Sequence, residues 1–260
     1  MSAAQLIAEA VLARRPAVIR DLPIPPELDW VGSEQAGLKR FESRLQDVNV
    51  YAASTAEGAD GIVRYVNPDS PADGSTGFLT SMTFAAFARE ILARSTRPEA
   101  APLFTQISGA DEIIPELSIL IAPLLGPLPR NRSGRWNLWI GSGANRINTH
   151  YDEPENFYFV LMGSKEFQLF PPEQSRNLYP GPLGQGHGGV TGSLVDAWNP
   201  DERAFPNYAE AQDHSVRYRL SAGDMLYLPA CWWHNVASIG VNFSANYWWS
   251  EVTPRSPPDP

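Results

Sequence analysis

The sequence contains one cysteine, Cys231, among 260 residues. A single cysteine excludes an intramolecular disulfide. This is typical of a chain that works in a reducing compartment, so we expect a cytoplasmic protein. The thiol itself is interpreted as a packing group and not as a nucleophile.

Long hydrophobic runs are also absent. No apolar stretch approaches the roughly 20 residues that a membrane-spanning helix requires. In residues 1–15 the arginines follow the apolar stretch and no cleavage pattern is present, so we expect a first helix there and not a secretory signal. With 43% hydrophobic and 19% charged residues, the composition is that of a soluble globular protein.

Positive charge is scarce. The 20 lysines and arginines are outnumbered by 29 aspartates and glutamates, which gives a formal net charge of −9. Such a field repels phosphate backbones, so nucleic-acid binding is not expected. Four arginines near the middle of the chain are interpreted as a solvated rim, with contact to a substrate as the alternative: Arg130, Arg132, Arg135 and Arg146.

Helical periodicity is strongest at residues 84–93. Behind Thr83, which is suited to cap a helix, apolar residues recur at i, i+3, i+4, i+7 and i+8: Phe84, Phe87, Ala88, Ile91 and Leu92. This stripe is expected to face the core. A second helix is expected at 34–46, and short strands are expected at 16–20, 48–53 and 62–66.

From residue 136 onward the sequence consists of short aromatic and β-branched runs, separated by glycine, proline and asparagine. The runs are 136–140, 147–151, 157–162, 165–170, 216–220, 225–228 and 241–249. Such a series predicts a mainly β fold, and a double-stranded β-helix (jelly roll) with flanking helices is favoured. We expect one domain at 1–253, made of an elaboration at 1–135 and a core at 136–253 with an insertion at 171–214, and a disordered tail at 254–260.

Three residues are candidate metal ligands. In a strand, residues i and i+2 face the same side, so His150 and Asp152 would present an imidazole and a carboxylate together. His234 follows the predicted strand 225–228 closely. Two imidazoles and one carboxylate leave three positions of an octahedral ion open, which is the ligand set of non-haem Fe(II) oxygenases. Zinc would more often take a fourth protein ligand, and the sequence offers no obvious one.

Lysine is rarer than arginine by far, with Lys39 and Lys165 as the two examples. An iron oxygenase of this kind usually takes two electrons from a keto acid that chelates the metal, and the distant carboxylate of that acid needs a buried cation. Lys165 lies one tight turn, residues 162–164, beyond the predicted strand 157–162, so an antiparallel hairpin is expected to return it to the same sheet. A slender ammonium side chain also suits a narrow pocket better than a planar guanidinium does.

Together these motifs resemble the cupin-like JmjC hydroxylases, a family that includes the asparaginyl hydroxylase inhibiting hypoxia-inducible factor and the small JmjC lysyl hydroxylases. The resemblance runs from about residue 136 to residue 249. It rests on His150-Tyr-Asp152-Glu-x-x-Asn156-Phe, Gly163-x-Lys165, Phe170-Pro-Pro, Gly223-Asp224-x-Leu-Tyr-Leu-Pro229, Trp232-Trp233-His234 and Asn246-Tyr-Trp248. In the first half, the family's entry strand is matched more loosely by Pro-Ala-Val-Ile-Arg at 16–20.

The resemblance implies a site for Fe(II), 2-oxoglutarate and O2. The residues that it implies as ligands to iron are His150, Asp152 and His234. For 2-oxoglutarate it implies Lys165 at the remote carboxylate, with Asn156 and Asn246 lining the pocket.

The sequence departs from the family at two positions. Relatives often carry a threonine three residues before the first ligand and a tyrosine on an earlier strand, and both bond the remote carboxylate. Here Ile147 and, by a looser alignment, Phe104 stand in those places. Tyr158, two residues from Asn156 and therefore on its face, is a candidate substitute donor. Weaker binding of 2-oxoglutarate, or use of a different keto acid, is the alternative.

The prediction is an Fe(II)- and 2-oxoglutarate-dependent dioxygenase that hydroxylates a C–H bond, with a protein or peptide side chain as the first choice of substrate. N-methyl-lysine demethylation is less favoured, because the chain has no room for the histone-reading modules that often accompany it. The alternatives are the same chemistry on a small molecule, such as an amino acid or natural product, and a metal-binding cupin without turnover. Either a monomer or a dimer is expected.

Overall fold

The computed structural model describes residues 2–55, 62–63, 78–97, 100–126, 128, 132–142, 145–183 and 190–251. The helices are α1 (Ala3–Ala13), α2 (Glu34–Leu45), α3 (Phe84–Ser95), α4 (Ala110–Ile113), α5 (Leu117–Ile121) and α6 (Tyr208–Asp213), with 3-10 turns η1 (Pro26–Leu28), η3 (Ala122–Leu124) and η4 (Pro172–Leu178). The strands are β1 (Ala17–Ile19), β2 (Asn49–Ser54), β3 (Ile62–Val63), β4 (Phe78–Thr83), β5 (Leu103–Ser108), β6 (Arg132–Ser142), β7 (Arg146–Tyr151), β8 (Glu155–Phe170), β9 (Thr191–Gly192), β10 (Val216–Ser221), β11 (Met225–Leu228) and β12 (Trp233–Glu251). Within these residues no helix has both the length and the apolar character to span a membrane.

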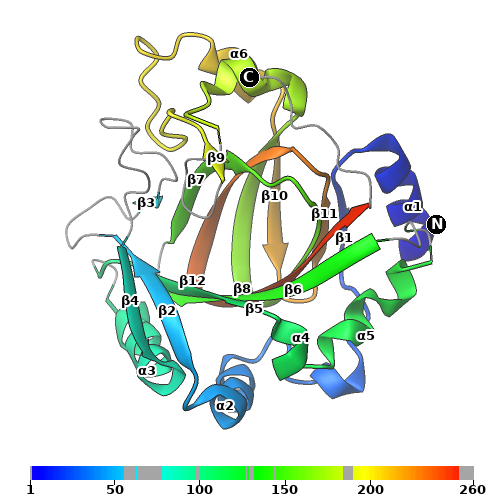
Figure 1. Ribbon diagram of the computed structural model, residues 1–260, viewed down its shortest axis with the longest axis vertical. Helices are drawn as coiled ribbons and strands as arrows, with labels where there is room; N and C mark the ends of the chain where they lie inside the picture. Colours follow the sequence, from blue (N-terminus) through cyan, green and yellow to red (C-terminus); the bar gives the residue numbers. More distant parts are fainter. Residues whose placement is uncertain are drawn as a thin grey trace.

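Two long strands, β8 and β12, organise the sheet, because each takes part in both of its layers. The last part of β8 lies between β10 and the first part of β12, which also pairs with β7. The first part of β8 lies between β11 and the last part of β12, and β6, β5, β2 and β4 continue that layer. The two layers enclose the centre of the molecule (Figure 1). The predicted jelly roll is therefore confirmed.

Both long strands bend at a glycine in the left-handed backbone region. Gly163 in β8 has φ 75° and Gly240 in β12 has φ 66°, and the register between the two strands shifts around Gly240. A Cβ atom on Gly163 would lie 2.5 Å from the carbonyl oxygen of Val241, so both the conformation and the close approach require glycine there. The hairpin predicted at 162–164 is wrong: the chain bends and continues as one strand.

The helices of the first half share their hydrophobic core with the layer that contains β6. Phe41 of α2 packs against Phe243 of β12, with the ring centroids 4.8 Å apart. Phe84 and Phe87 of α3 belong to the same buried cluster as Trp136 of β6. Figure 1 shows α2 and α3 beside the edge of the sheet formed by β2 and β4. This packing leaves the side of the layer that faces the centre of the barrel available for polar residues.

Most predicted elements of the first half correspond to observed ones. The helix predicted at 84–93 is α3, and the Thr83 hydroxyl caps it by accepting a hydrogen bond from the Ala86 N–H. The predicted helix 34–46 is α2. Part of the predicted strand 62–66 is β3, while residues 64–66 and the tail 254–260 lie outside the described residues. Strands β4 and β5 were not predicted.

The predicted insertion at 171–214 carries regular structure in its described part. It contributes η4, β9 and α6, and its Leu178, Val195 and Tyr208 pack with Trp233 of β12 in a buried cluster of their own. The Trp233 indole N–H also donates to the Ser175 hydroxyl at 2.8 Å. The insertion is thus anchored at the residue next to the candidate ligand in β12.

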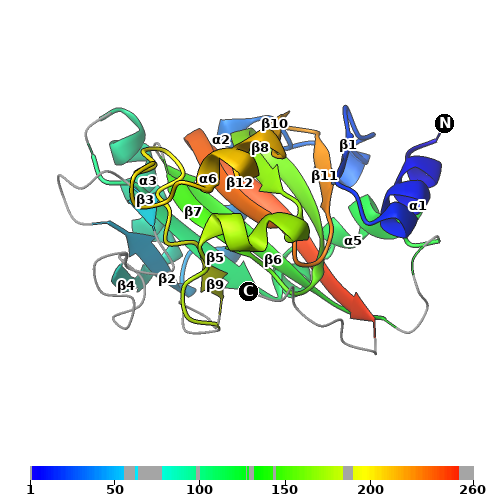
Figure 2. The same cartoon turned by 90° about the horizontal axis from the view of Figure 1, so that it is seen from above.

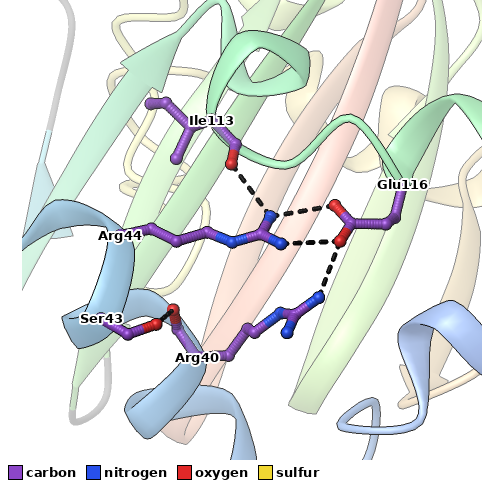
Figure 3. Close-up of polar contacts among 5 residues, drawn as sticks. All are labelled: Arg40, Ser43, Arg44, Ile113 and Glu116. Atoms are coloured by element: carbon purple, nitrogen blue, oxygen red, sulfur yellow. Dashed lines mark hydrogen bonds and ion pairs between the residues drawn. The ribbon is translucent and has the colours of Figure 1, made fainter.

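Three charged side chains tie α2 to the segment before α5 (Figure 3). Arg44 donates from both terminal nitrogens to the Glu116 carboxylate, at 2.9 and 2.7 Å, and Arg40 donates to it at 2.7 Å. Arg44 also donates to the Ile113 carbonyl at 3.0 Å. The hydrogen bond from Arg44 outweighs burial and lowers the pKa of Glu116 to about 2.

We expect Glu116→Gln to lower the free energy of unfolding at pH 7 by about 1 kcal/mol, because the partly exposed arginines are screened by solvent. The folded pKa of this carboxyl lies below its ordinary value of 4.5, so its contribution is complete above pH 4.5 and is lost as the pH falls toward 2. Urea denaturation at pH 7 and pH 3 measures the difference, with Glu112→Gln as the exposed control. A difference that does not shrink at pH 3 would contradict this account.

Candidate metal centre

His150, Asp152 and His234 come together on two neighbouring strands and the loop that follows one of them. His150 of β7 lies directly opposite His234 of β12, and their ring centroids are 4.2 Å apart. Asp152 follows the end of β7, and its Oδ2 lies 3.7 Å from Nε2 of His234. One potential ligand atom from each of the three residues lies within 4.8 Å of the other two. The three side chains are therefore close enough to hold one ion.

The two imidazoles are oriented by backbone carbonyls. Nδ1 of His150 lies 2.8 Å from the carbonyl oxygen of Asn148, and Nδ1 of His234 lies 3.1 Å from that of Trp232. A carbonyl only accepts hydrogen bonds, so in the neutral rings each Nδ1 donates its proton and each Nε2 keeps a lone pair for a metal. Burial, followed by the charge of His234, lowers the pKa of His150, which favours the neutral, metal-binding form.

The side chain of Asp152 is partly buried near these rings, with 14% of it exposed. Burial raises its pKa, and the neighbouring His234 opposes that effect. A divalent cation bound between the three groups would favour the ionised carboxylate of Asp152 and the neutral imidazoles at the same time. The ligand set thus fits a metal ion that accepts nitrogen and oxygen donors and keeps open positions.

A cavity of about 270 Å³ joins the candidate ligands to Lys165. All seven residues predicted for the site line it: His150, Asp152, Asn156, Tyr158, Lys165, His234 and Asn246. Ile147 and Phe104, the two departures from the family, line it as well. The sequence therefore predicted which residues share a cavity, while their individual roles stay predictions.

Lys165 is buried in this cavity with only 6% of its surface exposed. Its Nζ donates to the Ser238 hydroxyl at 3.0 Å and lies 5.7 Å from the centre of the Tyr158 ring. Among the residues that the structure describes, no carboxylate forms an ion pair with it. Burial lowers the pKa of Lys165 to about 7. A buried ammonium in this state is suited to an anionic ligand.

The two asparagines of the site are held by a chain of hydrogen bonds. Asn246 donates to the side-chain oxygen of Asn156 at 3.1 Å and accepts from the indole N–H of Trp139 at 2.7 Å. The hydroxyl of Tyr158 pairs with that of Ser244 at 2.6 Å. In this structure Tyr158 therefore presents its ring to Lys165 and its hydroxyl to a neighbouring strand. Its predicted role as a carboxylate donor stays a prediction.

Sequence reasoning did not single out several polar residues that line the cavity, among them Trp139 and Ser238. Trp139 lies in the run 136–140, which was predicted to be a strand, and a tryptophan in a strand is expected to pack in the hydrophobic core. Ser238 lies four residues beyond His234, so the period of two along a strand places both on the same face. That spacing was the available signal for Ser238.

A family model described as a cupin-like domain matches residues 3–254. Among curated proteins, the chain is 34% identical over 114 residues to Lysine-specific demethylase JMJ31 of Arabidopsis thaliana. It is 40% identical over 113 residues to HSPB1-associated protein 1 of Homo sapiens, and 33% identical over 114 residues to Lysine-specific demethylase 8 of Danio rerio. These matches cover 44%, 43% and 44% of this chain and 20%, 22% and 27% of those proteins, so most of each relative has no counterpart in the match.

A solved structure resembles nearly the whole chain. The X-ray structure of E. coli ycfD matches with a TM-score of 0.54 and 14% sequence identity, covering 95% of this chain and 53% of that one. At this identity the likeness concerns the fold alone, and it agrees with the jelly roll described above. Because the family model extends over residues 3–254, the protein belongs to the cupin-like domain family.

Proposed function

We propose that the protein is an Fe(II)- and 2-oxoglutarate-dependent dioxygenase that hydroxylates a C–H bond of its substrate. One observation carries the proposal: a two-histidine, one-carboxylate cluster and a buried lysine without a carboxylate partner, within the described residues, line the same cavity. A metal site alone would fit many cupins. The ammonium at the other side of the cavity adds the requirement for an anion.

In this proposal Nε2 of His150, a carboxylate oxygen of Asp152 and Nε2 of His234 hold the iron. The iron and 2-oxoglutarate, when bound, use O2 to insert one oxygen atom into a C–H bond, with succinate and CO2 formed from the keto acid. The carbonyls of Asn148 and Trp232 keep both imidazoles in the tautomer that can bind the metal.

Lys165 binds the remote carboxylate, and its burial makes this contact strong, because few water molecules compete for it. Asn246 and Asn156 line the cavity between the two layers and, through their shared hydrogen bond, fix each other's amide groups. The ring of Tyr158 lies beside the lysine, and both side chains are buried. These residues orient the keto acid and keep the site dry, which limits side reactions.

A protein or peptide side chain is the first choice of substrate. Supporting features are the exposed Arg135 and Gln106, which line the cavity and provide polar contacts for a chain lying outside it. N-methyl-lysine is a second candidate, because two of the relatives carry the name lysine-specific demethylase. The two differ in product: a hydroxylated N-methyl group releases formaldehyde, whereas a hydroxylated carbon side chain keeps the oxygen.

The test is conversion of 2-oxoglutarate to succinate with Fe(II), ascorbate and O2, followed by NMR spectroscopy. Incubation with peptide pools, metabolite pools and methyl-lysine peptides then separates the substrate classes by a mass gain of one oxygen or by release of formaldehyde. Succinate formation that depends on added iron supports the proposal. A protein that binds metal but forms no succinate under any of these conditions is a cupin without turnover, and the proposal fails.

A further inference from the structure

We propose that Arg135 selects substrates that carry a carboxylate group close to the hydroxylated carbon. This inference rests on the proposed function and extends it to the chemical class of the substrate. Arg135 is one of the four arginines interpreted from the sequence as a solvated rim, with contact to a substrate as the alternative. It belongs to β6, which pairs with β12, and β12 pairs in turn with β8; the three strands lie side by side in Figure 1 and Figure 2.

Arg135 belongs to a row of residues at the metal end of the cavity. Trp248 of β12 lies opposite Arg135 on one side and opposite Asn156 of β8 on the other, and all three line the cavity. Asn156 lies near the start of β8, four positions after Asp152. Lys165 lies beyond the bend of the same strand. A ligand bound by Arg135 is therefore on the side of the candidate metal ligands and not on the side of Lys165.

The guanidinium of Arg135 is exposed and available to a ligand. Its central carbon lies 5.5 Å from the centre of the Trp248 ring. The N–H donors of a guanidinium lie at the edges of its plane, so contact with a ring leaves them available. Among the residues that the structure describes, no carboxylate forms an ion pair with Arg135. In a chain with a net charge of −9, an arginine at a cavity without an acidic partner favours an anionic ligand.

Trp248 provides a second donor at the same row. Its indole Nε1 is buried, and within the described part of the chain it has no hydrogen-bond acceptor. A buried N–H without an acceptor is rare in folded proteins, and a bound ligand or water usually satisfies it. A carboxylate has two oxygen atoms, so one such group can accept from a guanidinium and from an indole together.

The charges around the cavity match a single anion at this row. Apart from the candidate metal ligands and Lys165, Arg135 is the one charged residue among the described residues that line the cavity. Its neighbours Gln106 of β5 and Trp139 of β6 contribute an amide and an indole. The planar guanidinium suits a carboxylate, which it can bind through two parallel hydrogen bonds. A cationic side chain such as N-methyl-lysine would be repelled here, so electrostatics disfavours it.

Two kinds of molecule carry such a carboxylate. In a peptide, an aspartate or glutamate beside the hydroxylated residue supplies it. In a free amino acid, the α-carboxylate supplies it. Both present the same group to Arg135, and they differ in whether the carboxylate belongs to a side chain or to the main chain. Matched substrate pools can separate the two.

The test measures hydroxylation with Fe(II), 2-oxoglutarate, ascorbate and O2. One peptide pool has Asp or Glu on both sides of a randomised residue, a second has Asn or Gln there, and a third has Lys. A pool of free amino acids is matched by a pool of their α-amides. The mass gain of one oxygen gives the turnover of each pool by the wild type, Arg135→Gln, Arg135→Glu and Arg203→Gln. Arg203 is an exposed arginine outside the cavity and serves as the matched control.

We expect the wild type and Arg203→Gln to hydroxylate one carboxylate-bearing pool at least about tenfold faster than its matched amide pool, as for a hydrogen bond to a charged group. The pool that shows this preference identifies the source of the carboxylate. Arg135→Gln should bring the ratio close to one. Arg135→Glu should prefer the lysine pool, a gain that misfolding cannot produce, and it decides the case if Arg135→Gln turns over no pool.

Several results would overturn the role of Arg135 and leave the proposed function standing. These are equal turnover of the matched pools by the wild type, a wild-type preference for the lysine pool, an unchanged ratio in Arg135→Gln, and succinate formation without an oxygenated product from either carboxylate-bearing pool. Absence of both succinate and product in every pool overturns the proposed function, and this inference with it. Calorimetry with Mn(II) and 2-oxoglutarate shows whether each variant is folded.

Discussion

Replacement of His234 by alanine is expected to abolish succinate formation and to weaken metal binding by more than about 100-fold. Loss of a group that merely orients a ligand already costs 10- to 100-fold in metal affinity, so loss of a direct ligand should cost more. The remaining pair, His150 and Asp152, would hold the ion at two positions only. No other described residue is grouped with these three as a potential ligand that could replace His234.

The matched control for this variant is His214→Ala. His214 is an exposed histidine at the end of α6, and its Nδ1 lies 2.9 Å from the Glu210 carbonyl, away from the cavity. Anaerobic titration with Fe(II) gives the affinity of each protein, and NMR spectroscopy gives the rate of succinate formation. Equal iron affinity in the wild type and in His234→Ala would remove His234 from the metal site and with it the basis for the proposed function.

Local sequence patterns predicted the parts of the molecule that depend on neighbouring residues. The stripe of α3 and its Thr83 cap lie within one short segment, and the period of two placed His150 and Asp152 together. Strands β4 and β5 were missed because neither has a long β-branched run, and β5 is held in the sheet by β2 and β6 on its two sides.

The course of β8 and β12 could not be predicted from the same signals. A glycine at positive φ ends many strands in a tight turn, and Gly163 was interpreted in that way. Here the bend is held by the close approach of the Val241 carbonyl, which lies 78 residues further along the chain. The pairing of Lys165 with Ser238 depends on this same bend. Contacts of this kind are set by register between distant segments, which local periodicity does not contain.

Replacement of Lys165 by methionine is expected to weaken 2-oxoglutarate by about 100-fold or more and, at the same time, to stabilise the ligand-free protein. The loss of affinity follows from leaving a buried carboxylate without its cation, which costs about 2–5 kcal/mol. The gain in stability follows from burial, which lowers the pKa of Lys165 from 10.5 to about 7, a cost of the order of a few kcal/mol to the folded state. A lysine that served only to stabilise the fold would show the opposite result.

The pH dependence distinguishes this account further. Between pH 7 and 10.5 the unfolded chain holds a proton on Lys165 that the folded, ligand-free chain releases, so the stability of the wild type rises with pH across that window. The advantage of Lys165→Met should therefore be largest below pH 7 and disappear toward pH 10.5. Urea denaturation of the ligand-free proteins at pH 6.5, 8 and 9.5 measures it, with Lys39→Met, on the exposed side of α2, as the control.

Ligand binding should show the complementary trend, because the carboxylate favours the protonated lysine. The affinity of the wild type for 2-oxoglutarate should be highest below pH 7 and fall as the pH rises above it, since binding then requires uptake of a proton. 2-Oxobutanoate has the same keto-acid group for the metal but no second carboxylate. Its affinity reports any effect of pH on the metal site and should not show the additional fall above pH 7. If the affinities for both keto acids depend on pH in the same way, or if Lys165→Met binds 2-oxoglutarate as tightly as the wild type does, the Lys165 ammonium does not contact the remote carboxylate.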